Sequence, residues 1–575
     1  MLNSSTVLPT ARLLVSKGKT KVWGWLRSWQ IRRALSYLTA IDGTSILSPK
    51  DGQLEASTLV IEPGEYVSAM LKLLLRLSTQ QQSEAIILSL RGFGETVYEM
   101  ERYPQALTSF KRVISLSRSL ASAIDDPHAD AQRQEFARPF LDSVWFLQGN
   151  CHYFLDQKEE AIASYDQALA LKPDLHQAWT NRGNALDDLG RKEEAIASYD
   201  QALALKPDLH QAWNNRGNAL SALGRQEEAI ASYDQALAFK PDYHQAWYNR
   251  GIALSDLGRK EEAIASYDQA LALKPDDHDA WYNRGTALSA LGRQEEAIAS
   301  YDQALALKPD YHEAWYNRGI ALDALGRKEE AIASYDQALA LKPDDHEAWN
   351  NRGIALSDLG RKEEAIASYD QALALKPDDH DAWNNRGTAL DALGRKEEAI
   401  ASYDQALALK PDLHQAWYNR GIVLDNLGRP EEAIASYDQA LALKPDKHEA
   451  WNNRGATLDA LGRKEEAIAS YDQALALKPD KHEAWNNRGA TLDALGRKEE
   501  AIASYDQALA FKPDLHQAWY NRGCVLSALG RKEEALEALQ QAIQLDPGCR
   551  ELAKTDTDFD SIREDERFKE LVGDE

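Results

Sequence analysis

A tryptophan returns every 34 residues through most of this 575-residue sequence, and that period constrains the fold more than any other feature. Eleven tryptophans keep the interval: Trp179, Trp213, Trp247, Trp281, Trp315, Trp349, Trp383, Trp417, Trp451, Trp485 and Trp519. Trp145 extends the series by one period, so the sequence divides into twelve repeats over residues 142–549. A fixed period of this size is typical of a solenoid, in which each repeat packs on its neighbours.

Residues 210–243 show how one repeat is expected to fold. Apolar residues recur at helical spacing on both sides of Gly224, which predicts two helices. Gly224 separates them because glycine tolerates the positive φ at which helices end. Pro241 ends the second helix because it lacks a backbone N–H. Each repeat is therefore predicted to be a pair of antiparallel helices.

The residue sizes within the repeat indicate how the two helices pack. The small residues Gly217, Ala229 and Ala236 are expected where the helices touch, and the rings of Trp213 and Tyr233 where the gaps are wider. A fully buried tryptophan removes roughly 150–250 Å² from water. The indole rings are therefore predicted to be buried and to contribute much of the packing energy.

This spacing of Trp, Gly, Ala, aromatic, Ala and Pro resembles the tetratricopeptide repeat. The resemblance covers residues 142–549 and implies an all-α fold, a right-handed superhelical solenoid of antiparallel helix pairs. It also implies an inner surface lined mostly by the first helix of each repeat. One departure is the arginine three residues after each tryptophan, such as Arg216, where the family more often has leucine. We expect this difference to alter the local packing and not the fold.

The segments outside the twelve repeats are shorter and less regular. Residues 87–118 are predicted to be a degenerate repeat, because Gly94, Ala106 and Phe110 keep the spacing while Leu90 replaces the tryptophan. The remaining segments are expected to be a helical N-terminal region with a basic start (1–86), an insertion (119–141) and C-terminal capping helices (550–575).

Composition and charge exclude several classes of function. The net charge of -25 opposes binding to a phosphate backbone, so no nucleic-acid partner is expected. The three cysteines, Cys151, Cys524 and Cys549, are too scattered for a disulfide framework, which favours a reducing, cytoplasmic location.

No catalytic residues, cofactor or metal site are expected. No nucleophile-and-base set, glycine-rich phosphate loop or metal motif occurs in the sequence, so we do not expect an enzyme. One histidine recurs three residues before each of the eleven tryptophans, from His176 to His516. One histidine per repeat cannot converge on a metal ion, so a position in the turns is expected instead.

An asparagine two residues after each tryptophan forms the main candidate binding feature. The asparagine column, as we call it, consists of Asn181, Asn215, Asn249, Asn283, Asn317, Asn351, Asn385, Asn419, Asn453, Asn487 and Asn521. A carboxamide both donates and accepts, so a column of them can bracket the backbone of an extended peptide. The column resembles the asparagines in the repeat domain of O-linked N-acetylglucosamine transferases. The alternative is that each asparagine ties adjacent repeats together.

Three other positions vary between repeats and are candidate contacts. The residue after the tryptophan is tyrosine in some repeats (Tyr248, Tyr282, Tyr316, Tyr418 and Tyr520) and asparagine in others. Acidic residues occur two before the tryptophan (Asp279, Glu313, Glu347 and Asp381) or eight after it (Asp187, Asp323, Asp391, Asp425, Asp459 and Asp493). A surface lined by them would favour basic or neutral peptides, although a solvated helix face also explains them.

The leading hypothesis is a non-catalytic scaffold that binds peptide segments of other proteins in the concave groove of the array. One alternative is a membrane-surface adaptor, because residues 12–33 are basic, contain Trp23, Trp25 and Trp29, and could lie on anionic lipid. A helical cap with a chance excess of positive charge also explains that segment. A third hypothesis is a regulatory partner of an enzyme.

Overall fold

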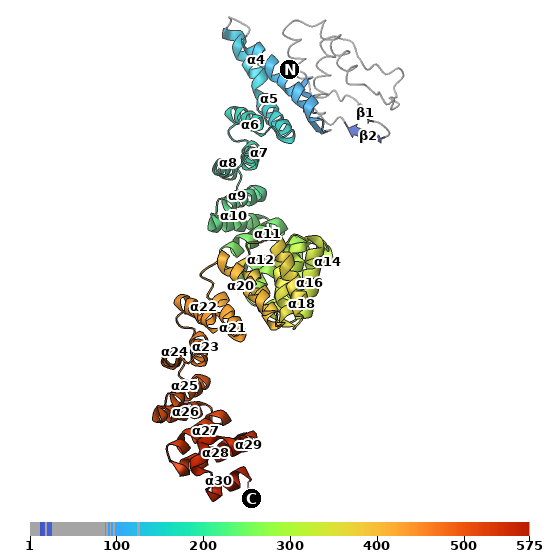
Figure 1. The fold of residues 1–575 in the computed structure, drawn as a ribbon. Coiled ribbons are helices and arrows are strands. Elements are labelled where there is room, and N and C mark those ends of the chain that lie inside the picture. The colour runs from blue at the N-terminus through green and yellow to red at the C-terminus, as the bar shows by residue number, and fades with distance from the viewer. Residues whose placement is uncertain are drawn as a thin grey trace. The chain divides into compact units, whose positions relative to one another are not determined.

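The computed structural model describes residues 12–17 and 20–25, separate positions between 87 and 99, and residues 101–122 and 127–573. The chain divides into two compact units, Met1–Leu291 and Gly292–Glu575, and each is described by itself. Helices dominate the described residues and follow one another as antiparallel pairs (Figure 1). The all-α solenoid predicted from the 34-residue period is therefore confirmed.

The first unit contains a short hairpin and a run of paired helices. Its elements are β1 (Arg12–Lys17), β2 (Thr20–Trp25), α4 (Tyr103–Ser122), α5 (Pro127–Phe154), α6 (Lys158–Leu171), α7 (His176–Asp188), α8 (Lys192–Leu205), α9 (His210–Ala222), α10 (Gln226–Phe239), α11 (His244–Asp256), α12 (Lys260–Leu273) and α13 (His278–Ala290). From α7 to α27, the odd-numbered helices are the first helices of their repeats and begin at the recurring histidine.

The second unit continues the same alternation and ends in shorter helices. Its elements are α14 (Gln294–Leu307), α15 (His312–Ala324), α16 (Lys328–Leu341), α17 (His346–Asp358), α18 (Lys362–Leu375), α19 (His380–Ala392), α20 (Lys396–Leu409), α21 (His414–Asn426), α22 (Pro430–Leu443), α23 (His448–Ala460), α24 (Lys464–Leu477), α25 (His482–Ala494), α26 (Lys498–Phe511), α27 (His516–Ala528), α28 (Lys532–Leu545), α29 (Gly548–Thr555), the 3₁₀ helix η1 (Thr557–Ile562) and α30 (Glu566–Val572).

The turn inside each repeat depends on its glycine. Gly190 follows α7 with a φ of 76°, in the left-handed region that a residue with a side chain rarely adopts. The next N–H, that of Arg191, donates to the carbonyl of Leu186 at 2.9 Å, which closes the end of the helix. The chain can therefore reverse within a few residues and start the second helix.

Tyrosine, and not tryptophan, occupies the centre of the first eleven of the twelve repeats, and Leu539 takes that place in the last. Tyr199 is 1% exposed, and its ring lies against the backbone of Gly183 in the paired helix. Trp179 is only partly buried, because its indole Nε1 reaches out to donate to the carbonyl of Pro173 in the turn between repeats, at 2.9 Å. The prediction that the indole rings are fully buried is therefore wrong, since they lie at the edge of the seams between repeats.

The N-terminal segment differs from the helical region expected there. Residues 12–17 pair antiparallel with residues 20–25, from Arg12 opposite Trp25 to Lys17 opposite Thr20. The β-branched and aromatic residues of these segments favour strands. The prediction of helix is wrong for these residues. The rest of the basic segment 12–33 lies outside the described residues.

The two ends of the repeat array are closed differently. The expected insertion 119–141 is taken up by the end of α4 and the first half of α5. Gly94 packs on the ring of Phe110 as the glycines of the regular repeats pack on tyrosine. At the other end, Phe559 and Phe568 are buried against the last repeat, as an apolar cap requires.

Candidate functional site

The asparagine column lies on the first helices, where each side chain is partly buried and several donate to the preceding repeat. In the first unit, Asn181 donates from Nδ2 to Oδ1 of Asn150 at 2.9 Å. Asn215 donates in the same way to Asn184 at 3.0 Å. These amides tie adjacent repeats together, which was the alternative considered for the column.

Tyrosines at the position after the tryptophan serve as acceptors for the same column. Asn283 donates to the hydroxyl of Tyr248 at 3.0 Å, and Asn351 donates to Tyr316 at 3.0 Å. Burial raises the pKa of the Tyr248 hydroxyl to about 12, so it stays protonated at neutral pH. The tyrosine therefore bridges two repeats and is not simply a solvated side chain.

Several amides in the second unit make no such bond. In other repeats the residue after the tryptophan is asparagine, which has a shorter side chain than tyrosine. One of these, Asn350, still contacts the next repeat, because its Oδ1 accepts from Asn385 at 3.3 Å. The buried Oδ1 atoms of Asn384, Asn452 and Asn486 have no hydrogen-bond partner among the described residues.

The arginine three residues after the tryptophan, where the family more often has leucine, bonds to both neighbouring second helices in most repeats. Arg352 donates from Nε to Asp336 at 2.6 Å and from Nη1 to the buried Ser368 at 2.7 Å. Its guanidinium also lies 5.8 Å from the ring centroid of Trp349, within range of a cation–π contact. The arginine thus joins the second helices of two adjacent repeats, a role that leucine could not fill.

The recurring histidines and acidic residues are mostly engaged within the array. His312 begins a first helix and lies 3.6 Å from Asp345 in the next turn, consistent with the position expected for these residues. Asp187 and Asp323 pair with lysines of their own repeats at 2.8 and 2.9 Å. Carboxylates two residues before the tryptophan are more open, and Asp381 is 67% exposed.

Three asparagines of this surface were missed by the sequence analysis. Asn150, Asn184 and Asn218 stand five residues after their tryptophans and accept from the buried tyrosine hydroxyls at 2.8–2.9 Å. Later repeats replace them with isoleucine, threonine, alanine or cysteine, and this change along the chain was the available signal. A pocket of about 220 Å³ adjoins the first two, lined by Tyr98, Asn150, Tyr153, Phe154, Tyr165, Asn181 and Asn184.

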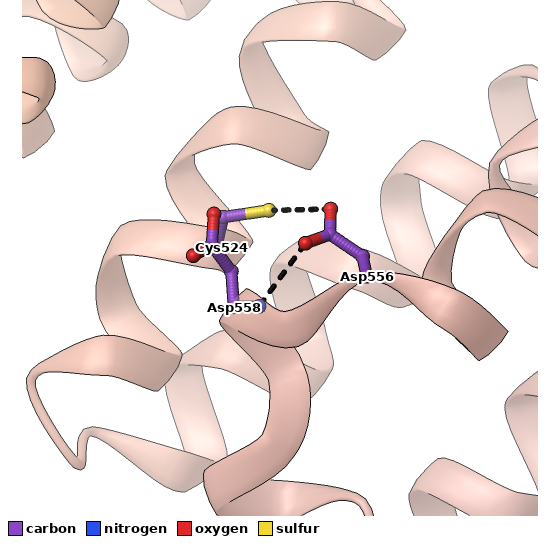
Figure 2. Close-up of side chains that lie close together, drawn as sticks. All are labelled: Cys524, Asp556 and Asp558. Carbon is purple, nitrogen blue, oxygen red and sulfur yellow. Dashed lines mark hydrogen bonds between the residues drawn. The ribbon is translucent and has the colours of Figure 1, made fainter.

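The C-terminal cap brings together Cys524, Asp556 and Asp558, which the sequence did not connect (Figure 2). One ligand atom from each lies within 4.8 Å of the others, a spacing that a metal ion could bridge. Two of these groups already bond to each other, however, because the Cys524 thiol donates to Asp556. Asp556 accepts from the backbone N–H of Asp558 at 3.0 Å and from the Tyr520 hydroxyl at 2.8 Å, so it caps η1 and anchors it to the last repeat.

Family models match nearly the whole repeat region. Models described as tetratricopeptide repeat match residues 248–312, 282–346, 316–380, 350–414, 418–482, 457–516 and 516–549, and one described as TPR repeat matches residues 149–190, 183–224 and 217–258. Helix pairs of this length, most of them with a glycine against an aromatic ring, define a helical repeat protein. The chain belongs to the tetratricopeptide repeat family.

Solved structures of other repeat proteins resemble parts of the chain. YrrB, described as a TPR protein with an unusual peptide-binding site, is 24% identical over 32% of this chain and 95% of its own, with a TM-score of 0.30. MamA from Desulfovibrio magneticus is 22% identical over 30% of this chain and 96% of its own, with a TM-score of 0.29.

A TPR repeat-containing protein from Cytophaga hutchinsonii is 18% identical over 42% of this chain and 98% of its solved part, with a TM-score of 0.38. No curated protein matches the chain. Among the described residues, no helix has the length and apolar character needed to cross a membrane.

Proposed function

We propose that the chain is a non-catalytic scaffold that binds extended segments of other proteins along the first helices of its repeats. The observation that supports this is the contrast between the two helices. The second helices α8, α12, α16, α18, α20 and α24 share one sequence, KEEAIASYDQALAL. The first helices instead vary at the positions two before and one, five and eight after the tryptophan. The second helices α10, α14, α22 and α26 differ from that sequence only at their first or last residue, and α28 differs more widely. Variation concentrated on the first helices is expected where those helices contact partners.

The charge of the chain favours neutral or basic partners. The net charge is -25, and carboxylates such as Glu313 and Asp381 are about half exposed or more at the start of first helices. Like charges would repel an acidic segment, whereas lysine or arginine side chains gain from these carboxylates. The partner is therefore an extended, neutral or basic peptide segment.

The test uses a library of random twelve-residue peptides displayed on phage and selected on the full chain. Peptides that are enriched are then synthesised with a fluorophore and titrated by fluorescence anisotropy. We expect enriched peptides with net positive or zero charge. If no peptide is enriched over a no-protein control, the scaffold function is wrong.

A pair of matched variants locates the binding helix. One changes three exposed first-helix residues, Ile320, Ala456 and Ala490, to arginine; the other changes three exposed second-helix residues, Leu341, Ala476 and Ala510, to arginine. The charge added is the same in both. We expect the first variant to weaken binding at least about tenfold and the second to leave it within about twofold. Equal losses would contradict binding along the first helices.

A further inference from the structure

We propose that the pocket of about 220 Å³ in the first unit binds a methylated ammonium group, in the cage formed by Tyr98, Tyr153 and Phe154. Such a group occurs in free quaternary amines and in methylated lysine side chains. The inference goes beyond the proposed scaffold function and does not depend on it, because a small cation can be tested without any peptide.

The first repeat departs from all later ones at two aromatic residues. Tyr153 and Phe154 lie at the end of α5, eight and nine residues after Trp145. The eleven later repeats carry serine or aspartate at the first of these positions, and alanine, aspartate or asparagine at the second. The repeat fold therefore does not require a ring at either position. Phe154 is nevertheless 55% exposed, which is expected of a ring that contacts a ligand.

The rings around the pocket are held at different angles by their neighbours. Tyr103 at the start of α4 stacks on Phe154, with ring centroids 4.6 Å apart and 15° between the planes. Tyr153 meets Phe154 edge-on at 5.9 Å, and Tyr98 meets Tyr103 edge-on at 5.6 Å. Several ring faces and edges thus surround one cavity. A cation gains from each ring face that it approaches.

Lys158 shows that an ammonium is stable beside these rings. Its Nζ lies 3.6 Å from the ring centroid of Tyr153 and 3.0 Å from the carboxylate of Asp188, although Lys158 is not one of the residues that line the pocket. Burial, followed by the carboxylates of Asp188 and Asp187, raises the pKa of Tyr153 to about 12. The charges beside the pocket therefore favour a positive ligand over a negative one.

The amides of the pocket favour a cation that donates no hydrogen bonds. Oδ1 of Asn150 accepts from Tyr165 at 2.8 Å and from Asn181 at 2.9 Å, and its Nδ2 donates to Tyr98 at 3.2 Å. Oδ1 of Asn184 likewise accepts two hydrogen bonds. A primary ammonium brings three donors that need acceptors, whereas a quaternary ammonium brings none. The pocket therefore suits a methylated ammonium better than an unmodified lysine.

The experiment titrates the full chain with two matched pairs of small compounds. Choline is compared with dimethylbutanol, its neutral isostere in which carbon replaces the ammonium nitrogen. Acetylated trimethyllysine is compared with acetylated lysine, and this pair tests a modified side chain in place of a free amine. Binding is measured by isothermal titration calorimetry. We expect at least one methylated cation to bind about fivefold or more tightly than its matched compound, the size of a desolvated cation–π contact.

Two substitutions give the first repeat the residues that the third repeat carries. Tyr153→Ser reproduces Ser221 and Phe154→Ala reproduces Ala222, so both residue types are compatible with the repeat fold. Each should weaken binding of the cation about fivefold or more. Phe154→Trp should retain binding, because indole is the ring that attracts a cation most strongly.

The matched control is Phe239→Ala. Phe239 is 46% exposed at the end of α10 and lies outside the pocket, so its loss should leave binding within about twofold. Circular dichroism at 222 nm and the urea midpoint check that each variant is folded. Loss of binding in Phe154→Ala together with retention in Phe154→Trp supports the cage even if Tyr153→Ser proves unstable.

Three outcomes would overturn the inference. The first is that neither methylated cation binds at millimolar concentration, and the second is that each binds no better than its matched compound. The third is unchanged affinity in Phe154→Ala, which would place the cation elsewhere on the acidic surface. A failed peptide selection would leave all of these measurements in place, so the scaffold function and this inference can fail separately.

Discussion

Gly319 lies so close to the ring of Tyr335 that a Cβ on the glycine would stand 2.5 Å from Cε1. That distance is far inside van der Waals contact, and the 1%-exposed ring has no space to retreat. We expect Gly319→Ala to destabilise the second unit by about 1–3 kcal/mol, the cost of forcing extra volume into a packed core. Urea unfolding of the full chain measures this change.

The chain offers a matched control in Gly523. Leu539 replaces the tyrosine of that repeat, and a Cβ at Gly523 would meet nothing closer than 3.5 Å. Gly523→Ala should therefore be neutral or stabilise the helix by up to about 1 kcal/mol. Equal destabilisation by both substitutions would show that the tyrosine ring does not explain the glycine.

Arg352 joins adjacent second helices, and its loss should weaken the seam between them. Removing it with Arg352→Ala breaks two bonds of 2.6 and 2.7 Å, to Asp336 and Ser368. We expect a loss of about 1–3 kcal/mol. The control is Arg361→Ala, which breaks an exposed pair with Glu364 at 2.6 Å within one helix and should leave the urea midpoint unchanged.

The buried tyrosines predict a sharp loss of structure in alkali. Burial raises the pKa of Tyr403 from 10.0 to about 12, and it also raises the pKa of Tyr199 and Tyr335. The folded state binds these protons more tightly than the unfolded state, so the stabilisation is complete below pH 10 and falls as pH rises toward 12. In that pH range each buried tyrosine lowers the free energy of unfolding by about 1.4 kcal/mol per pH unit.

Two spectroscopic signals test this prediction on one sample. Helix content at 222 nm should fall in one cooperative step between pH 10 and 12, and the tyrosinate absorbance at 295 nm that the eleven repeat-centre tyrosines contribute should rise in the same step. Ionisation of all 23 tyrosines near pH 10 with the helices intact would contradict the buried position of these eleven rings.

Asp556 should control the reactivity of the Cys524 thiol. Cys524 is 6% exposed, its Sγ lies 3.7 Å from Asp556, and burial together with that carboxylate raises its pKa (Figure 2). Asp556→Ala removes the negative charge and the cap of η1, so labelling of Cys524 by a thiol reagent should accelerate at least about tenfold.

Peptide mapping by mass spectrometry identifies which cysteine reacts. Cys151 is fully buried in the other unit and serves as an internal reference, so its labelling should not change. Equal acceleration at both cysteines would indicate general unfolding and would contradict a local effect of Asp556.

The helices and turns were predictable because the same residues occur at the same positions in repeat after repeat. The turn glycine, the proline after the second helix and the small residues opposite the aromatic ring all follow from backbone and packing rules that act within 34 residues. Gly224, for example, was expected to have a positive φ, and its φ is 75°. Local rules of this kind do not depend on the neighbouring repeats.

The partners of the asparagine column could not be predicted in the same way. Whether Asn283 meets a ligand or Tyr248 depends on the offset between repeats, which the sequence of one repeat does not contain. The same holds for Arg352, whose two acceptors lie on different second helices. The pairing of residues 12–17 with residues 20–25 was not predicted, although the β-branched Val15 and Val22 favour strands.

The near-identical neighbours 447–480 and 481–514 make the length of this protein easy to change. Every junction in that stretch is built from the same residues, so loss or gain of one 34-residue block by unequal recombination recreates a junction that already folds. The resulting chains would differ in the distance between the proteins bound to them, while the stability of each 34-residue repeat stays the same. The gene can therefore change the length of the repeat array without a new interface between repeats.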